Sequence, residues 1–162
     1  MRRFHLIITK SEGFELRNNS LYRVRNGAFH KVRIVTKIFY DPYRDPLEAL
    51  IDTGAFHSVI PKNILNGSLI KVEKIDLSNL SERLQNSFHK LRGIAGGEIN
   101  CDFKMVYCPL IDKNNNRKIF KFPAKIDLTG TRKQPILGMM GFLERYRLFI
   151  DVTGENAFLV IP

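Results

Sequence analysis

An apolar segment that ends abruptly in one carboxylate and a turn occupies residues 47–55 of this chain. Residues 47–52 predict a strand that ends at Asp52, and Thr53 and Gly54 follow it directly. A carboxylate seldom lies at the end of a buried strand unless it is paired or used chemically. Thr53 can donate and accept a hydrogen bond beside it, and Gly54 allows a close backbone approach. The segment therefore predicts a strand that presents Asp52 in a cleft; the alternative is a strand that ends in an ordinary Asx turn.

Alternating apolar and polar residues run through most of the chain and predict an all-β fold. We expect strands over residues 4–9, 31–40, 47–52, 98–110, 118–122, 124–128, 147–152 and 157–161. Pro123 should divide two of these strands, because proline cannot donate a hydrogen bond to a central ladder. Turn-forming residues at 41–46 and 112–117 predict loops between paired strands.

Four short segments favour helical or mixed structure. Residues 139–145 predict one short helix near the C-terminus, and residues 61–65 predict a single helical turn. Residues 81–85 fit a helix, whereas residues 89–92 fit equally well the outgoing strand of a hairpin.

The length of 162 residues suits one folded domain with a substantial core. We interpret residues 1–30 as a basic N-terminal extension, in the form of an added strand or hairpin, and residues 31–162 as the main domain. The formal charge of +10 is concentrated in residues 1–37, which hold nine Lys and Arg against two Glu. Such a balance could attract nucleic acid or an acidic partner. Because the cations are scattered and no nucleic-acid motif accompanies them, we favour a solvated basic face.

The two cysteines predict neither a disulfide nor a metal site. Cys101 and Cys108 are seven residues apart on one expected strand, so they lie on opposite faces. Their spacing is not that of metal ligands. Free thiols fit a reducing compartment, and we expect a cytoplasmic protein. No apolar run is long enough to predict a membrane span.

Three elements of the sequence resemble, in their order and spacing, the retropepsin family of single-domain aspartic proteases. They are the Asp-Thr-Gly at 52–54, the glycine-rich segment at 93–97, and an Ile-Leu-Gly at 136–138 just before the expected helix. The resemblance extends over residues 32–161. It implies an all-β, retropepsin-like closed barrel or sandwich with one short C-terminal helix and a flap hairpin, assembled as a homodimer.

The resemblance also implies a role for each element. Asp52 would be the catalytic residue, and the catalytic loop would be supported by Thr53, Gly54 and Ala55. A flap that closes over an extended polypeptide substrate would be formed by Gly93, Ile94, Ala95, Gly96 and Gly97. Packing beneath the active site would come from Ile136, Leu137 and Gly138. Neither a metal nor a cofactor is implied.

Peptide hydrolysis of this kind needs two carboxylates that share one proton, because one activates water while the other protonates the carbonyl oxygen. The chain contains one Asp-Thr-Gly. Asp127 and Asp151 also precede Thr-Gly, but with one residue inserted, which predicts hairpin turns. The second carboxylate would therefore come from a second copy, with the cleft on the two-fold axis. We expect an aspartic endopeptidase that is inactive as a monomer.

Two positions depart from the pattern common among retroviral members. Phe56 and His57 stand where acidic residues often follow the Ala, and Met139 stands where an Arg often pairs with them. Acid and base are missing together, so we interpret the change as an apolar replacement. Two alternatives stay open: an inactive, dimeric peptide-binding module of the same fold, and a basic nucleic-acid-associated protein in which the motif is coincidental.

Overall fold

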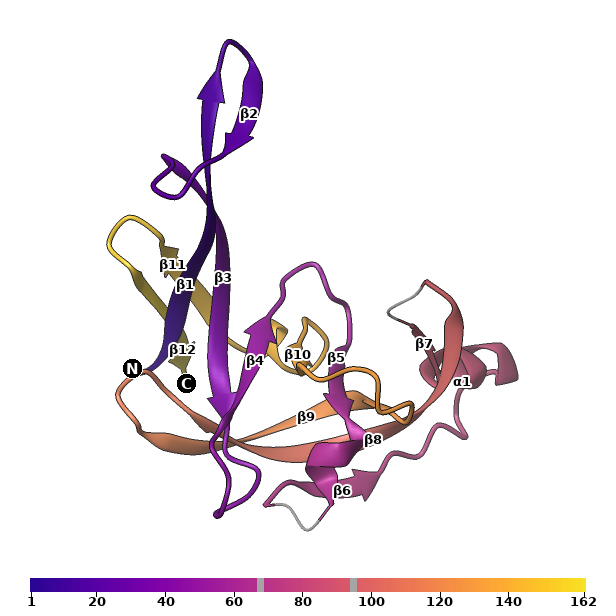
Figure 1. Ribbon diagram of the computed structural model, residues 1–162. Helices are drawn as coiled ribbons and strands as arrows, with labels where there is room; N and C mark the ends of the chain where they lie inside the picture. The colour runs from indigo at the N-terminus through magenta and orange to yellow at the C-terminus, as the bar shows by residue number, and fades with distance from the viewer. Residues whose placement is uncertain (67–68, 94–95) are drawn as a thin grey trace.

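The computed structural model describes residues 1–66, 69–93 and 96–162, and confirms a predominantly β chain (Figure 1). Its strands are β1 (Arg2–Arg17), β2 (Ser20–Arg23), β3 (Phe29–Ile38), β4 (Leu47–Ile51), β5 (Ser58–Pro61), β6 (Lys71–Lys74), β7 (Lys90–Arg92), β8 (Glu98–Ile111), β9 (Arg117–Asp127), β10 (Ile136–Leu137), β11 (Arg147–Asp151) and β12 (Asn156–Ile161). Its helical segments are α1 (Glu82–Phe88) and the 3₁₀ helices η1 (Lys62–Leu65) and η2 (Leu143–Arg145).

The strands pair into one extensive sheet that folds back on itself. Neighbours along it run β11-β12-β1-β3-β4-β10-β5-β9-β8-β6, with β2 on β1 and β7 on β8. Lys37 and Ile38 of β3 also pair with Ile111 and Leu110 of β8. The path from β3 through β4, β10, β5, β9 and β8 therefore returns to β3 as a closed circuit of paired strands.

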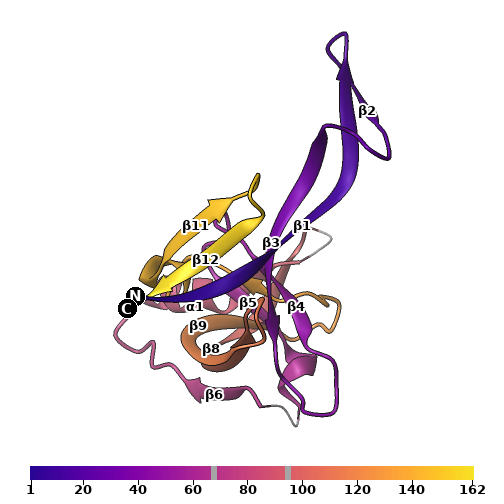
Figure 2. The same cartoon turned by 90° about the vertical axis from the view of Figure 1, so that its left-hand side faces the viewer.

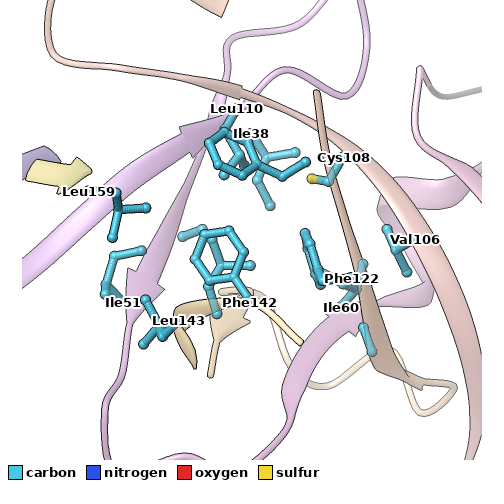
Figure 3. Close-up of a cluster of buried hydrophobic side chains, with 14 of the residues drawn as sticks. Ile38, Ile51, Ile60, Val106, Cys108, Leu110, Phe122, Phe142, Leu143 and Leu159 are labelled. Atoms are coloured by element: carbon cyan, nitrogen blue, oxygen red, sulfur yellow. The ribbon is translucent and has the colours of Figure 1, made fainter. Parts of the chain in front are cut away.

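Phenylalanine rings form the centre of the core. Phe120, Phe122 and Phe142 are fully buried, and the Phe142 ring meets the other two edge-on at 5.6 and 5.2 Å between ring centres. In Figure 3, Phe142 lies between Phe122 on one side and Ile51 and Leu143 on the other. Edge-to-face ring pairs add to the stabilisation from apolar burial. The segment before η2 is thereby fixed against β9 and the end of β4.

Part of β1 and β3, together with β2, forms an arm that protrudes from the rest of the molecule (Figures 1 and 2). β1 pairs with β12 near its start, with β3 along its middle, and with β2 at its end. Large apolar side chains on this arm, including Leu16, Leu21 and Phe29, are about half exposed. A ribbon without a second layer gains little from apolar burial.

The prediction of a short helix over residues 139–145 is wrong. Only Leu143–Arg145 is helical, and it is the 3₁₀ segment η2. Gly141 has a φ of 71°, which interrupts any regular right-handed helix at that point. The one α-helix in the described part of the chain is α1, in the middle of the sequence rather than near its C-terminus. Ser81 caps it by accepting a hydrogen bond from the Leu84 backbone N–H.

The expected break at Pro123 is also wrong, because β9 runs through it without interruption. Pro123 is level with Met105 of β8, and the parallel pairing of β9 with β5 begins only at Ala124. The missing N–H of Pro123 therefore falls outside the β5 ladder.

The other sequence expectations divide between hairpins and loops. The loops at 41–46 and 112–117 connect paired strands as expected, and Asp151 lies at the β11–β12 hairpin turn. Asp127 instead ends β9 and leads into the long connection to β10.

Cys101 and Cys108 are both buried, and neither forms a disulfide. Within residues 1–66, 69–93 and 96–162, no helix has the length and apolar character that crossing a membrane requires.

Candidate active site

Asp52 lies directly after β4, at the start of a turn that its own carboxylate stabilises. Its side-chain oxygen Oδ1 accepts a hydrogen bond of 2.9 Å from the Gly54 backbone N–H, and its carbonyl oxygen accepts one of 3.3 Å from the Ala55 N–H. Asp52 is half-buried, whereas Thr53 and Gly54 are exposed. The turn therefore fixes the orientation of the carboxylate and leaves part of it open to solvent or to a ligand.

β10 supports this turn from below. Ile136 and Leu137 pair in parallel with Leu50 and Ile51 of β4, and Ile136 also pairs with Val59 of β5. The Asp52 backbone N–H donates to the Leu137 carbonyl oxygen at 3.0 Å. The strand that delivers Asp52 and the strand that leaves its turn are thus held apart by a third strand between them.

Gly138 allows the backbone after β10 to pass very close to the Asp52 turn. A Cβ atom at this position would lie 2.6 Å from the His57 carbonyl oxygen and 2.7 Å from that of Ala55. The Gly138 N–H donates to the Ser58 hydroxyl at 2.9 Å, and the Met139 N–H donates to the Ala55 carbonyl at the same distance. Only glycine fits this approach without displacing one of the two chains. The structure therefore brings the 52–55 and 136–138 segments together.

Thr53 has no partner of the kind that the family resemblance implies. Its hydroxyl makes no hydrogen bond within the described part of the chain. The partner expected for it belongs to the opposite loop of a second copy, so its role across a two-fold axis stays a prediction.

The glycine-rich segment connects β7 to β8, which form an antiparallel hairpin. The Gly93 N–H donates to the Gly97 carbonyl, and the Gly96 N–H donates to the Gly93 carbonyl at 3.0 Å. Gly96 has a φ of 89°, a conformation that other residues rarely adopt. Ile94 and Ala95, also assigned to the flap, lie outside the described residues. In Figure 1, this hairpin and the turn that follows β4 rise on the same side of the β8–β9 ribbon.

His57 connects the Asp52 turn to the base of this hairpin. Its ring meets Phe88, the last residue of α1, at 5.6 Å between ring centres and Phe103 of β8 at 6.0 Å. Burial, with a smaller contribution from the Lys125 ammonium, lowers the pKa of His57 to about 4. The imidazole is therefore neutral over most of the pH range, and its role is packing.

A buried lysine holds the connection between α1 and β7. Lys125 of β9 donates to the carbonyl oxygens of Ser87 and Lys90, at 3.3 and 2.5 Å. Burial lowers the pKa of its ammonium and raises the pKa of the neighbouring Cys101 thiol to about 11. The hairpin base is therefore fixed by a charged donor rather than by apolar packing alone.

The sequence interpretation did not identify Lys125 or Ser58 as parts of this region. One signal was available for each of them. Lys125 follows Ala124 and precedes Ile126 in an apolar strand, where an isolated cation needs partners, and Ser58 precedes two apolar residues in the same way. The pattern marks such residues as unusual but does not say which backbone groups they will meet.

No group of three or more His, Cys, Asp or Glu side chains is placed to hold a metal ion in the described residues. No protein-family model matches the chain, and no curated protein does so either. Among solved structures, a retropepsin-like aspartic protease from Rickettsia conorii is similar, with a TM-score of 0.44 and 19% sequence identity. That similarity covers 95% of this chain and 93% of the other.

Proposed function

We propose that this protein is an aspartic endopeptidase, which hydrolyses peptide bonds with water activated by a pair of Asp52 carboxylates. The observation that carries the proposal is the Asp52 turn itself. Its carboxylate is oriented by the Gly54 N–H, and its backbone is fixed from below by Leu137. A half-buried carboxylate held in one orientation and left open on one side suits general acid–base chemistry.

The second carboxylate would be contributed by Asp52 of a second copy. Two carboxylates at close distance cannot both ionise, so they share one proton and titrate as a pair. One of them then polarises water, and the other protonates the carbonyl oxygen of the scissile peptide. Thr53, exposed and without a hydrogen-bond partner in the described chain, is available to bind the opposite loop.

The β7–β8 hairpin would act as the flap of this enzyme. A polypeptide bound in an extended conformation can form main-chain hydrogen bonds with strands on both sides. Closure of a hairpin over it would exclude water from the reacting bond. Lys125 would keep the base of the hairpin in place during this closure.

The decisive experiment compares wild type with Asp52→Asn on a mixed peptide library. The amide oxygen of the substituted side chain can still accept the Gly54 N–H, so the turn should fold, but an amide cannot share the proton. We expect cleavage to fall by at least about 100-fold. Asp45→Asn, at an exposed loop position, is the matched control and should cleave like wild type. Undiminished cleavage by Asp52→Asn would overturn the mechanism.

Dilution tests the shared site. Activity per chain should fall as the dimer dissociates, because each site needs two chains. Sedimentation measured at the same concentrations shows whether the loss of activity follows the loss of dimer. A monomer that is fully active at every concentration would exclude a site shared between two copies. Peptide binding without cleavage by wild type would instead indicate the inactive peptide-binding module.

A further inference from the structure

One edge of β3 is unpaired beside the Asp52 turn. Along its first edge, β3 pairs with β1 from Phe29 to Val35. Along its second edge, it pairs with β4 only from Val35 to Ile38. Within the described chain, the second edge therefore has no neighbour between Phe29 and Ile34. In Figure 1, β3 rises past the end of β4, where the turn carrying Asp52 begins.

The hydrogen-bond pattern shows which groups this edge presents. The Leu50 and Asp52 N–H groups donate to the β10 side, so Ala49 and Ile51 direct their backbone groups toward β3. Thr36 is level with Ala49, and therefore directs its own groups toward β4. Alternation along the strand then directs those of Ile34, Val32 and His30 to the unpaired edge.

An independent hydrogen bond supports this assignment. The Arg33 carbonyl oxygen accepts the Thr9 hydroxyl of β1 at 3.4 Å, so Arg33 directs its backbone groups to the opposite edge. His30, Val32 and Ile34 thus offer a ladder of donors and acceptors with no partner in the described chain. An edge of this kind is a template for another extended segment.

The charge of the arm restricts the partner. The two acidic residues of the arm, Glu12 and Glu15, are ion-paired with Lys31 and Arg17. Arg23, Arg25 and Arg33 are exposed and form no ion pair in the described residues, and the Arg33 guanidinium donates a hydrogen bond to the Gln134 side-chain oxygen. Continued by two residues, the β3–β4 register would bring Arg33 level with Asp52. Of these three cations, Arg33 lies on β3 itself, so the strand with the open edge carries a positive charge beside the candidate catalytic residue.

We propose that this edge binds the flank of the polypeptide substrate, as an added antiparallel strand rich in acidic residues. The identification of the bound segment as substrate rests on the proposed peptidase function. The edge itself is present in the monomer whether or not cleavage occurs. Main-chain hydrogen bonds to His30, Val32 and Ile34 hold the segment, and the cations of the arm, Arg33 above all, select its charge. The substrate class is thus a chain with an acidic extended region beside the scissile bond.

The direct test measures binding to the full chain that carries Asp52→Asn, so that nothing is cleaved. The probe is a fluorescent peptide of alternating Glu and Val, compared with its Lys–Val counterpart. Val32→Pro removes one donor from the open edge, while Val32→Thr keeps the donor and the β-branched shape. We expect the Glu–Val peptide to bind at least about tenfold more weakly to Val32→Pro than to Val32→Thr. The Lys–Val peptide should not bind.

Charge is tested separately, with variants that leave the β3 backbone intact. Arg33→Glu should weaken binding of the Glu–Val peptide by about tenfold or more. Lys62→Glu, an equal change of charge at an exposed site on η1, should leave this binding unchanged. Equal binding by Val32→Pro and Val32→Thr would overturn the edge as the binding element. So would preferential, salt-sensitive binding of a single-stranded DNA oligonucleotide with no effect of Val32→Pro.

Cleavage kinetics then separate this inference from the proposed function. With a cleavable peptide extended by the Glu–Val segment, Val32→Pro should raise KM about tenfold with kcat unchanged, and leave the unextended peptide unaffected. Cleavage that is indifferent to Val32→Pro would remove the edge inference and keep the peptidase. If wild type binds the peptide through this edge but cleaves nothing, the edge inference is kept and the proposed peptidase function is removed.

Discussion

A Cβ atom on Gly138 would lie 2.6 Å from the His57 carbonyl oxygen, closer than any ordinary contact between such atoms. The same atom would lie 2.7 Å from the Ala55 carbonyl, so Gly138→Ala must push the Asp52 turn away from β10. We expect a loss of about 1–3 kcal/mol in the free energy of unfolding, and a larger proportional loss of the proposed activity. Urea denaturation and peptide cleavage on the same samples measure both.

Gly97→Ala is the matched control for Gly138→Ala. A Cβ atom on Gly97 would meet no heavy atom within 4 Å. The control should unfold at nearly the urea concentration of wild type. Equal stability of the two variants would show that the close approach beneath the Asp52 turn does not constrain the fold.

The neutral His57 predicts a loss of stability in acid. Its pKa in the folded protein is about 4, below the ordinary value of 6.5. Between these values the unfolded chain binds the proton and the folded chain does not, so the free energy of unfolding falls as pH falls from about 6.5 to 4. Because the ring is only half-buried, we expect a contribution on the order of 1 kcal/mol. His57→Phe, which keeps the aromatic contacts, should remove it.

Urea midpoints at several pH values between 4 and 7 measure this effect. His30→Phe, a change of one imidazole at an exposed position, is the control for the substitution itself. If His57→Phe loses stability in acid as steeply as wild type, other groups must cause the loss.

Lys125→Met should loosen the base of the β7–β8 hairpin. The variant keeps the length of the side chain but leaves the Ser87 and Lys90 carbonyls without their charged donor. We expect a loss of about 1–3 kcal/mol, since hydrogen bonds to charged groups contribute on this scale. Hydrogen exchange should become faster in α1 and β7 before it changes in β9. Lys113→Met, in the exposed β8–β9 turn, should leave both measurements unchanged.

The hairpin tip offers a comparison between two adjacent glycines. Both Gly96 and Gly97 have open space where a Cβ atom would be added, but only Gly96 has a left-handed φ, of 89°. Gly96→Ala should therefore strain the tip by about 1 kcal/mol, and Gly97→Ala should not. Cleavage rates and melting temperatures of the pair separate backbone strain from steric effects. A lower rate for Gly97→Ala alone would indicate direct contact with substrate.

Local pattern predicted several elements of the fold and its connections. The alternation that marks β3, β8 and β12 follows from burial of one face of a strand, which a sequence records residue by residue. The turn at Asp52 was also predictable, because Asp, Thr and Gly favour such a turn through their own side-chain and backbone properties. The absence of a regular helix at residues 139–145 was not predictable, since a left-handed Gly141 against the Pro123 ring depends on a contact from another strand.

The sequence by itself determined strands such as β3, β8 and β12, the Asp52 turn and the basic character of the N-terminal third, because these depend on neighbours along the chain. Only the tertiary structure decided that Gly138 passes beneath His57, that Lys125 donates to the Ser87 and Lys90 carbonyls, and that β3 extends beyond the end of β4. These relationships join residues far apart in sequence, and no local preference encodes which of many possible partners they will meet. The pairing register of the folded sheet selects them.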